Sequence, residues 1–274
     1  MRPQTPEERA RRAASFNEDA ERYDRARPTY PNELFDHLWS TAELGPAPGV
    51  LEIGCGTGQA SVSLAERGAR LTCVEFGENM AAIARRKLAA FPDSKVIVSK
   101  FEEWDPVDRR FDVIFAAASW HWIPQVVRYE KAAYVLRPGG SLAIVSSHHF
   151  YPSGFDPLFI PIQEVYGEVT GTQLEVKAQE MPDLGALDDR DRDHIAEMEQ
   201  TGAFEDPTVT RVRWHFERGA DEYIDLLATF SDHWALEPEQ RALLFERIRR
   251  LIVDSPTGTI TKHYLTTLRV ARRR

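Results

Sequence analysis

The sequence predicts an α/β fold in which helices cover both faces of a doubly wound, mostly parallel sheet. Three observations support this class. Short apolar segments typical of strands alternate with segments of helical periodicity between residues 50 and 145. The first of these strands, Val50–Ile53, runs into glycines on alternate positions, namely Gly54, Gly56 and Gly58. The first two strands carry acids at their ends, Glu52 and Glu75, where ligands bind in such sheets.

Length and composition limit the classes of function. A chain of 274 residues can bury a sizeable core, and we expect a single domain over 1–274. The formal net charge of -9 argues against nucleic-acid partners. No apolar run is long enough for a bilayer and no signal-peptide pattern opens the chain, so no membrane partner is expected. Cys55 and Cys73 lie in predicted core elements, which indicates neither disulfides nor a zinc site and fits the cytoplasm.

Two helices are expected before the first strand. Thr5–Glu8 has the pattern of a capping box with proline at the first helical position, so a helix should run from there toward Tyr23. Its apolar residues are few, so it must lie over another part of the protein. Pro28 and Pro31 then favour an extended passage. The second helix has one apolar face, made of Leu34, Phe35, Leu38 and Trp39.

The glycine segment predicts a sharp turn whose backbone approaches a ligand, because residues without Cβ leave that space open. A dinucleotide fingerprint, G-x-G-x-x-G, would require its third glycine at Gln59, whereas here it comes at Gly58. Glu52 would repel a pyrophosphate and attract an ammonium or a sulfonium. S-adenosylmethionine carries both. A tight turn without a ligand is the alternative, and it leaves the acid unexplained.

A short buried helix, with Ala60 and Leu64, should stop at Gly68, and the second strand should end at Glu75. Glu75 lies 21 positions beyond Gly54, near the distance at which a doubly wound fold presents a carboxylate to ribose hydroxyls. The alternative is an exposed residue at a strand end. Phe76 and Met80 could pack on ribose and adenine or belong to the core.

The third strand, Val96–Val98, precedes a fourth at Phe111–Ala116 that opens into Trp120-His121-Trp122. A helix from about Gln125 to Leu136 leads through the turn Arg137–Gly140 to a fifth strand, Ser141–Val145, and then to His148–Tyr151. Residues just past strand ends line the ligand crevice of such sheets, so both clusters are candidates for substrate contact. His121 is the best candidate general base, since imidazole exchanges protons near neutrality; a hydrogen-bonded wall residue is the alternative.

The alternation of helices and strands stops between about Tyr151 and Pro207, where an acidic, loop-like run surrounds Asp188–Asp191. We expect a cap inserted after the fifth strand; a surface excursion without a role in binding is the alternative. A strand around Val212–Phe216, a helix Asp221–Ser231, a helix around Leu243–Ile252 and a strand Ile260–Val270 should close the chain.

Glu52-Ile53-Gly54-Cys55-Gly56-Thr57-Gly58 resembles the E/D-x-G-x-G-x-G signature of class I S-adenosylmethionine-dependent methyltransferases. The resemblance implies a Rossmann-like sheet of seven strands, in which the last is antiparallel and lies between the fifth and sixth. It covers nearly the whole chain, although its specific motifs lie in 50–145. The implied division is an N-terminal helical lid at 1–40, a cofactor-binding core at 41–150, an inserted cap at 151–207 and closing elements at 208–274.

The opening segment, with Tyr23 and Arg27-Pro28-x-Tyr30-Pro31, is similar to the lid of a subgroup that includes trans-aconitate-type enzymes. This similarity implies that Tyr23 and Arg27 lie near the methionine end of the cofactor, with Arg27 paired to its carboxylate; ordinary surface residues are the alternative. The family often has an acid that contacts adenine where this chain has Lys100. Glu102 would substitute, with Phe101 stacked on the base.

The implied activity is methyl transfer to an oxygen, nitrogen or carboxylate of a small molecule, achieved mainly by positioning. RNA methylation and cofactor binding without catalysis are the alternatives. The expected cofactor-binding residues are Tyr23, Arg27, Glu52, Gly54, Cys55, Gly56, Gly58, Glu75, Phe76, Met80, Phe101, Glu102 and Ala117. The expected substrate-binding residues are Trp120, Trp122, His148, His149 and Tyr151. No histidine spacing demands a metal, and the sequence does not predict an oligomeric state.

Overall fold

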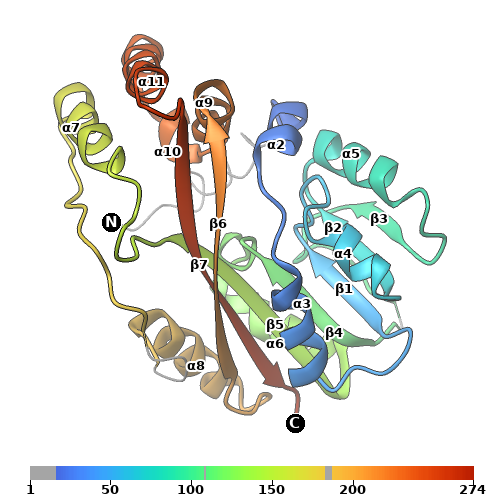
Figure 1. Ribbon diagram of the computed structural model, residues 1–274. Coiled ribbons are helices and arrows are strands. Elements are labelled where there is room, and N and C mark those ends of the chain that lie inside the picture. Colours follow the sequence, from blue (N-terminus) through green and yellow to red (C-terminus); the bar gives the residue numbers. More distant parts are fainter. Residues whose placement is uncertain (1–16, 108, 183–186) are drawn as a thin grey trace.

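The structure is a computed structural model that describes residues 17–107, 109–182 and 187–274 (Figure 1). The start of the helix predicted from Thr5 therefore lies outside the described residues. The described part of that region contains α2 (Ala20–Ala26), which is capped by the side chain of Asp19. The expected second helix is α3 (Asn32–Thr41), and it buries Leu34, Phe35 and Leu38.

The described strands form one sheet of seven in the order β3-β2-β1-β4-β5-β7-β6. Their bounds are β1 Gly49–Ile53, β2 Arg70–Glu75, β3 Lys95–Val98, β4 Phe111–Ala117, β5 Leu136–His149, β6 Thr208–Gly219 and β7 Thr259–Arg272. The first five strands are parallel, and β7 pairs antiparallel with both β5 and β6. The doubly wound, mostly parallel sheet predicted from the sequence is confirmed.

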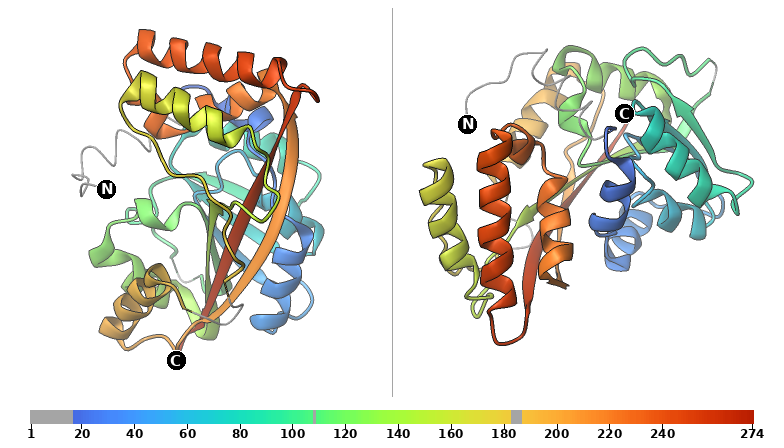
Figure 2. Two further views of the ribbon diagram at one scale, coloured as in Figure 1. Left: turned by 60° about the vertical axis from the view of Figure 1, so that its left-hand side comes forward. Right: turned by 90° about the horizontal axis from the view of Figure 1, so that it is seen from above.

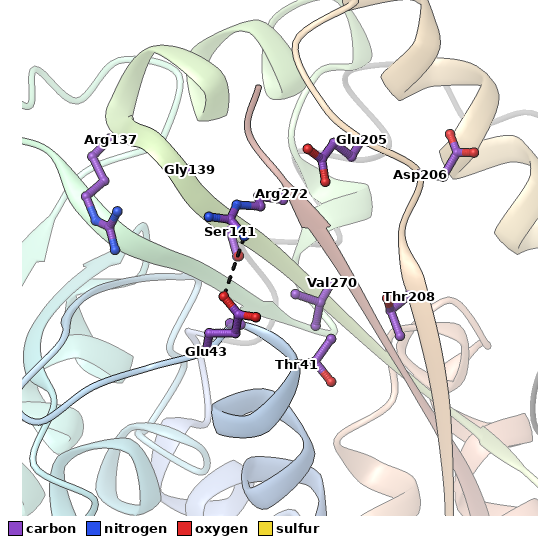
Figure 3. A pocket seen from close by; sticks show the side chains of 11 residues that line it. Thr41, Glu43, Arg137, Gly139, Ser141, Glu205, Asp206, Thr208, Val270 and Arg272 are labelled. Atoms are coloured by element: carbon purple, nitrogen blue, oxygen red, sulfur yellow. Dashed lines mark ion pairs between the residues drawn. The ribbon is translucent and has the colours of Figure 1, made fainter.

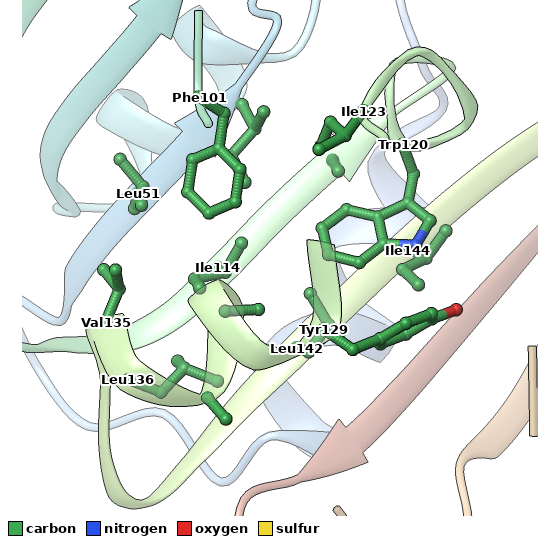
Figure 4. Close-up of a cluster of buried hydrophobic side chains, with 14 of the residues drawn as sticks. Leu51, Phe101, Ile114, Trp120, Ile123, Tyr129, Val135, Leu136, Leu142 and Ile144 are labelled. Atoms are coloured by element: carbon green, nitrogen blue, oxygen red, sulfur yellow. The ribbon is translucent and has the colours of Figure 1, made fainter. Parts of the chain in front are cut away.

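Helices cover both faces of this sheet. Neighbouring residues of a strand point to opposite faces, so they belong to different cores. Val113 and Phe115 of β4 face a core with α3, α4 (Ser61–Glu66) and α5 (Glu78–Leu88). Ile114 and Ala116 face the other core, which includes α6 (Gln125–Val135) (Figure 4). The strands therefore read as continuous apolar runs.

Two segments differ from their prediction. The turn expected at Arg137–Gly140 belongs to β5, because a bulge between Phe111 and Val113 lets the strand begin early and Gly139 pairs with Arg273 of the closing segment. The acidic run at Asp188–Asp191 is not a loop. It starts α8 (Asp189–Thr201) through a capping box between Asp188 and Asp191, and Asp191 is fully buried.

The segment 151–207 contributes to two separate places. Its first helix, α7 (Phe159–Thr170), packs on α11 (Pro238–Val253), whereas α8 packs on α6. Beside α11 lie α9 (Ala220–Ala228) and α10 (Ser231–Trp234). Figure 2 shows α7, α11 and α9 side by side beyond the end of β5, and α9 also contacts α2. These helices thus form a helical layer at the carboxyl ends of β5 and β6 and the amino end of β7.

Candidate functional site

The glycine turn after β1 is held in a conformation that requires glycine. Gly54, Gly56 and Gly58 have φ of +65°, +58° and +89°, the left-handed region that side chains disfavour. A Cβ on Gly54 would lie 2.5 Å from the Cβ of Ser119, and the hydroxyl of Ser119 donates to the carbonyl of Ile53. Ala118 has φ +54°, so the chain after β4 turns sharply and brings Ser119 against the glycine turn.

Glu52 lies beneath this turn. Its side chain is 2% exposed, and its Oε2 accepts hydrogen bonds from the Ser61 hydroxyl at 2.6 Å and the Cys73 thiol at 3.6 Å. Burial raises the pKa of Glu52 to about 7, despite these bonds. The carboxyl group is therefore directed toward Ser61 of α4 and Cys73 of β2. Direct contact of Glu52 with a bound cation stays a prediction.

Glu75 connects the glycine turn to the turn after β2. Its Oε2 accepts from the backbone N–H of Gly56 and its Oε1 from that of Gly77, both at 2.8 Å. Burial raises the pKa of Glu75, and the backbone donors oppose that shift. Each carboxylate oxygen keeps capacity to accept one further hydrogen bond. Phe76, the next residue, is 44% exposed and offers an apolar surface beside it.

The helix α2 extends over the glycine turn. Cε1 of Tyr23 lies 3.7 Å and Cε of Met80 3.5 Å from the position that a Cβ on Gly56 would take. Met80 is buried and packs with Tyr23, so it belongs to the core and borders the turn at once. Ion pairs of Glu21 with Arg86 and of Asp24 with Lys87 fasten α2 to α5.

Arg27 caps the end of α2 and points toward the helical layer. Its Nε donates to the Thr229 hydroxyl at 2.8 Å and its Nη2 to the Thr229 carbonyl at 2.9 Å. The guanidinium lies 4.1 Å from the centre of the Phe230 ring and 5.1 Å from that of Tyr23. These contacts leave three of its five N–H groups for other acceptors. Its pairing with a cofactor carboxylate stays a prediction.

Two aromatic residues are not where the sequence analysis expected them. Phe101 is 3% exposed and Trp120 2% exposed, and both rings pack in the core beside α6 (Figure 4). The predicted stacking of Phe101 on adenine and the predicted substrate contact of Trp120 are therefore corrected. The physical reason is the turn at Ala118, which directs Trp120 back against Tyr129 at 5.2 Å between ring centres.

The remaining residues predicted around this edge stay near the surface. His121 is exposed and Trp122 half-buried in the turn η1 (Trp120–Trp122), with 4.6 Å between their ring centres. Ala117, the last residue of β4, is half-buried, and so is Glu102, whose carbonyl accepts from Lys131. The buried thiol of Cys55 lies within the glycine turn and contacts the carbonyl of Gly56 at 3.6 Å.

His148 and His149 do not form one cluster, because neighbouring residues of β5 point to opposite faces. His148 contacts Arg190 of α8, and burial together with nearby arginines lowers its pKa to about 4. His149 packs with Tyr151 at 4.3 Å and Phe159 at 4.5 Å, and burial lowers its pKa to about 2. Only His149 and Tyr151 therefore share a surface.

Three residues of this region have surroundings that were not predicted from the sequence. Ser119 supports the glycine turn. Tyr30 lies near both Glu52 and Arg27, and its pKa is raised chiefly by burial. Lys262 of β7 is only 6% exposed. The signal for Lys262 was available, since it stands on the buried side of an alternating strand, at the same parity as Ile260 and Leu268.

A polar hollow of about 220 Å³ lies elsewhere, between the first residues of β5 and the last residues of β7 (Figure 3). Arg272 and Glu43 form an ion pair of 3.5 Å within it. Because it opens at the end of the sheet opposite the glycine turn, we do not assign the candidate site to it. Across the described residues, no group of three or more His, Cys, Asp or Glu could hold a metal ion. None of the helices described there is long and apolar enough to cross a membrane.

Comparison with known proteins agrees with this geometry. Residues 50–140 match the model of the methyltransferase domain family. The chain is 35% identical over 131 residues to an uncharacterized methyltransferase of Mycobacterium tuberculosis, covering 48% of this chain and 51% of that protein. It is 32% identical over 124 residues to an Escherichia coli trans-aconitate 2-methyltransferase, covering 43% and 45%. The chain thus spans about half the length of these relatives.

Solved structures extend the likeness of fold over most of the chain. A protein of Anaeromyxobacter dehalogenans assigned as a type II methyltransferase has a TM-score of 0.58 and 24% identity, with 90% of this chain and 97% of that chain covered. A phosphoethanolamine N-methyltransferase 2 of Haemonchus contortus has a TM-score of 0.52 and 14% identity, covering 98% and 60%.

The sheet order, the glycine turn and the matched domain together define a Rossmann-like methyltransferase domain. Residues 50–140 are therefore similar to a methyltransferase domain, as the resemblance of the glycine turn to class I S-adenosylmethionine-dependent methyltransferases implied.

Proposed function

We propose that this protein transfers a methyl group from S-adenosylmethionine to a small-molecule acceptor. The observation that carries the proposal is the glycine turn itself: its backbone is bare, the ring of Tyr23 lies over Gly56, and the carboxylate of Glu75 receives the Gly56 N–H. The backbone of the turn and the carboxylate beside it form the cradle that we assign to a ligand with ribose hydroxyls and a positive centre.

The residues present fit that cofactor. Glu75 would accept from the ribose hydroxyls, the exposed ring of Phe76 would support the adenosine, and Tyr23 with Arg27 would close over the methionine part. Gly54, Gly56 and Gly58 provide the close backbone approach. When bound, the cofactor supplies an electrophilic methyl group on a sulfonium. A Cβ on Gly56 would stay at ordinary contact distance from Tyr23 and Met80, so a larger side chain is needed to fill the cradle.

In the reaction, the chain would act chiefly by holding the acceptor in line with the methyl group, which can contribute roughly 7–11 kcal/mol. We assign the wall that holds the acceptor to the loop after β4, where His121 is exposed and Trp122 half-buried. His121 would accept the proton of a hydroxyl or an amine, whereas a carboxylate acceptor needs no base. The acceptor group is thus an oxygen, a nitrogen or a carboxylate.

Two observations favour a small-molecule acceptor over RNA, and a third favours a cytoplasmic location. The net charge of -9 opposes phosphate binding, and one relative is named for its action on trans-aconitate. Cys55 and Cys73 are both free thiols, which suits a reducing compartment. Cofactor binding without catalysis is distinguished by turnover alone.

The test combines calorimetry with a methyl-incorporation screen. S-adenosylmethionine should bind and NADH should not, and Gly56→Val should abolish binding because the valine methyls fill the space under Tyr23. Gly68→Val is the matched control, since Gly68 also has positive φ (+83°) with nothing within 4 Å of its Cβ position. Labelled methyl should enter a metabolite extract and not total RNA. Preference for NADH, or incorporation into RNA alone, would overturn the proposal.

A further inference from the structure

The region between the helical layer and β7 contains a buried ammonium group without a counter-ion. Lys262 is 6% exposed, and within the described ranges its Nζ has no hydrogen bond or ion pair. Three rings surround that atom, with distances to their centres of 5.3 Å for Phe230, 5.5 Å for Tyr264 and 5.7 Å for Tyr223. Rings stabilise a cation only in part, so the ammonium retains unused donors.

A second cation and a nitrogen without a hydrogen-bond partner lie near the same ammonium. The guanidinium of Arg27 lies on the ring of Phe230, which Lys262 also contacts. Nε2 of His149 is buried and, in the part of the chain that the structure describes, has no hydrogen-bond partner. Lys262 and His149 both lie beside the ring of Tyr264, and Lys262 and Arg27 both lie beside that of Phe230, so the three groups are neighbours.

Burying the charged side chain of Lys262 without a counter-ion lowers the stability of the ligand-free protein. Burial lowers the pKa of Lys262 to about 7, and the nearby positive charge of Arg27 adds to the shift. The one carboxylate that opposes the shift belongs to Asp232, whose side chain is 75% exposed. Buried charges in proteins are normally paired, so the buried ammonium of Lys262, with the half-buried guanidinium of Arg27 on the same ring, indicates a place for an anion supplied from outside.

The position in the sheet separates this place from the cofactor's. Two strands, β4 and β5, lie between β1 and β7, which puts Lys262 roughly 14 Å to the side of the glycine turn at the usual strand spacing. Tyr30 lies between these regions in the sense that the charges of both Glu52 and Tyr264 reach its hydroxyl and raise its pKa. A ligand at Lys262 would therefore stand beside the bound cofactor.

We propose that Lys262 binds an oxyanion, a carboxylate or phosphate, of the methyl acceptor, and that the surrounding rings receive its apolar body. The anion accepts from Nζ of Lys262 and from Nε2–H of His149. Tyr151, Phe159 and Tyr264 surround His149 and supply the apolar walls. This inference rests on the proposed function, because it assigns the group to the acceptor.

The test uses the whole protein and three variants. Lys262→Met removes the charge at similar volume, Lys262→Arg keeps it, and Lys95→Met removes an exposed lysine from the far end of β3 as a matched control. Lys262→Met should melt no lower than the wild type, because it replaces an unpaired buried charge with an apolar chain. S-adenosylmethionine affinity should stay within about threefold in all variants.

Phenylacetate, phenyl phosphate and neutral phenylacetamide are then titrated into protein saturated with S-adenosylhomocysteine. We expect one or both anions to bind, at least about tenfold more weakly to Lys262→Met and within about threefold to Lys262→Arg. The amide should show no such dependence. Comparing the two anions identifies the preferred oxyanion.

Three results would overturn the inference. No anion binds the wild type up to about 10 mM; the anions bind Lys262→Met as well as the wild type; or Lys262→Met loses affinity for S-adenosylmethionine, which would assign the oxyanion to the cofactor. In each case the cofactor still binds the wild type and the proposed function stands. Failure of the wild type to bind the cofactor would instead remove the proposed function.

Discussion

Glu52 is a buried carboxyl group whose protonation should control the stability of the fold in mildly acidic solution. Its pKa is about 7 in the folded protein, raised from 4.5 mainly by burial. A raised pKa means that the folded state favours the protonated group. The stabilising effect is therefore fully present below pH 4.5 and is lost as the pH rises through about 7.

Glu52→Gln fixes this position in a form that resembles the neutral acid. The amide oxygen can still accept from the Ser61 hydroxyl, which now lies 2.6 Å from Oε2. The change in pKa corresponds to about 3 kcal/mol at one pKa unit per roughly 1.4 kcal/mol. The variant should match the wild type near pH 4.5 and exceed its free energy of unfolding by up to about 3 kcal/mol at pH 8.

Urea denaturation at both pH values measures this difference directly. Glu66→Gln, at the exposed end of α4, is the matched control and should leave the pH dependence of the wild type unchanged. A raised pKa at Glu52 is contradicted if Glu52→Gln loses stability between pH 4.5 and 8 as steeply as the wild type does, or if it is the less stable protein at pH 8.

Three further substitutions test the site and its support. Glu75→Gln replaces an oxygen that accepts a backbone N–H with an amide donor; calorimetry should show S-adenosylmethionine binding weakened by about 1–3 kcal/mol, and an unchanged dissociation constant would remove Glu75 from the site. Gly54→Ala places a Cβ 2.5 Å from that of Ser119, so cofactor binding should disappear, whereas Gly68→Ala should retain it. Asp191→Asn leaves Arg211 and Arg269 without their buried counter-charge and should lower the free energy of unfolding by about 3–5 kcal/mol. Asp189→Asn, at a 98% exposed side chain, should cost far less.

The parts of the fold that were predicted from the sequence are those with strong local patterns. Val50–Ile53 and Phe111–Ala117 are apolar runs bounded by turns, and the glycines between Gly54 and Gly58 mark a change of chain direction that needs no distant contact. The direction of side chains beyond the strand ends depends on single backbone angles. The positive φ of Ala118 has no residue-type signal, since alanine rarely adopts it, and it moves Trp120 from the crevice into the core.

Residues whose role depends on distant partners were the hardest to identify. Asp191 reads as part of an acidic surface run until Arg211 and Arg269 are brought against it, from 20 and 78 positions away. Lys262 was also difficult to identify from the sequence. Its neighbours Tyr223 and Phe230 belong to a helical layer whose packing no local pattern specifies. Strand parity alone indicated that it points inward.

The place of β7 within the sheet has a consequence for how the chain folds. Although it is the last of the strands in sequence, it hydrogen-bonds to β5 on one side and β6 on the other. During synthesis the parallel strands β1–β5 can pair before β7 is made, and the outer edge of β5 is then unpaired. An unpaired strand edge can hydrogen-bond to other chains. Arg269, which neutralises Asp191, arrives with the same strand. Pairing of β7 thus closes the sheet and also completes the neutralisation of Asp191, which Arg211 of β6 shares.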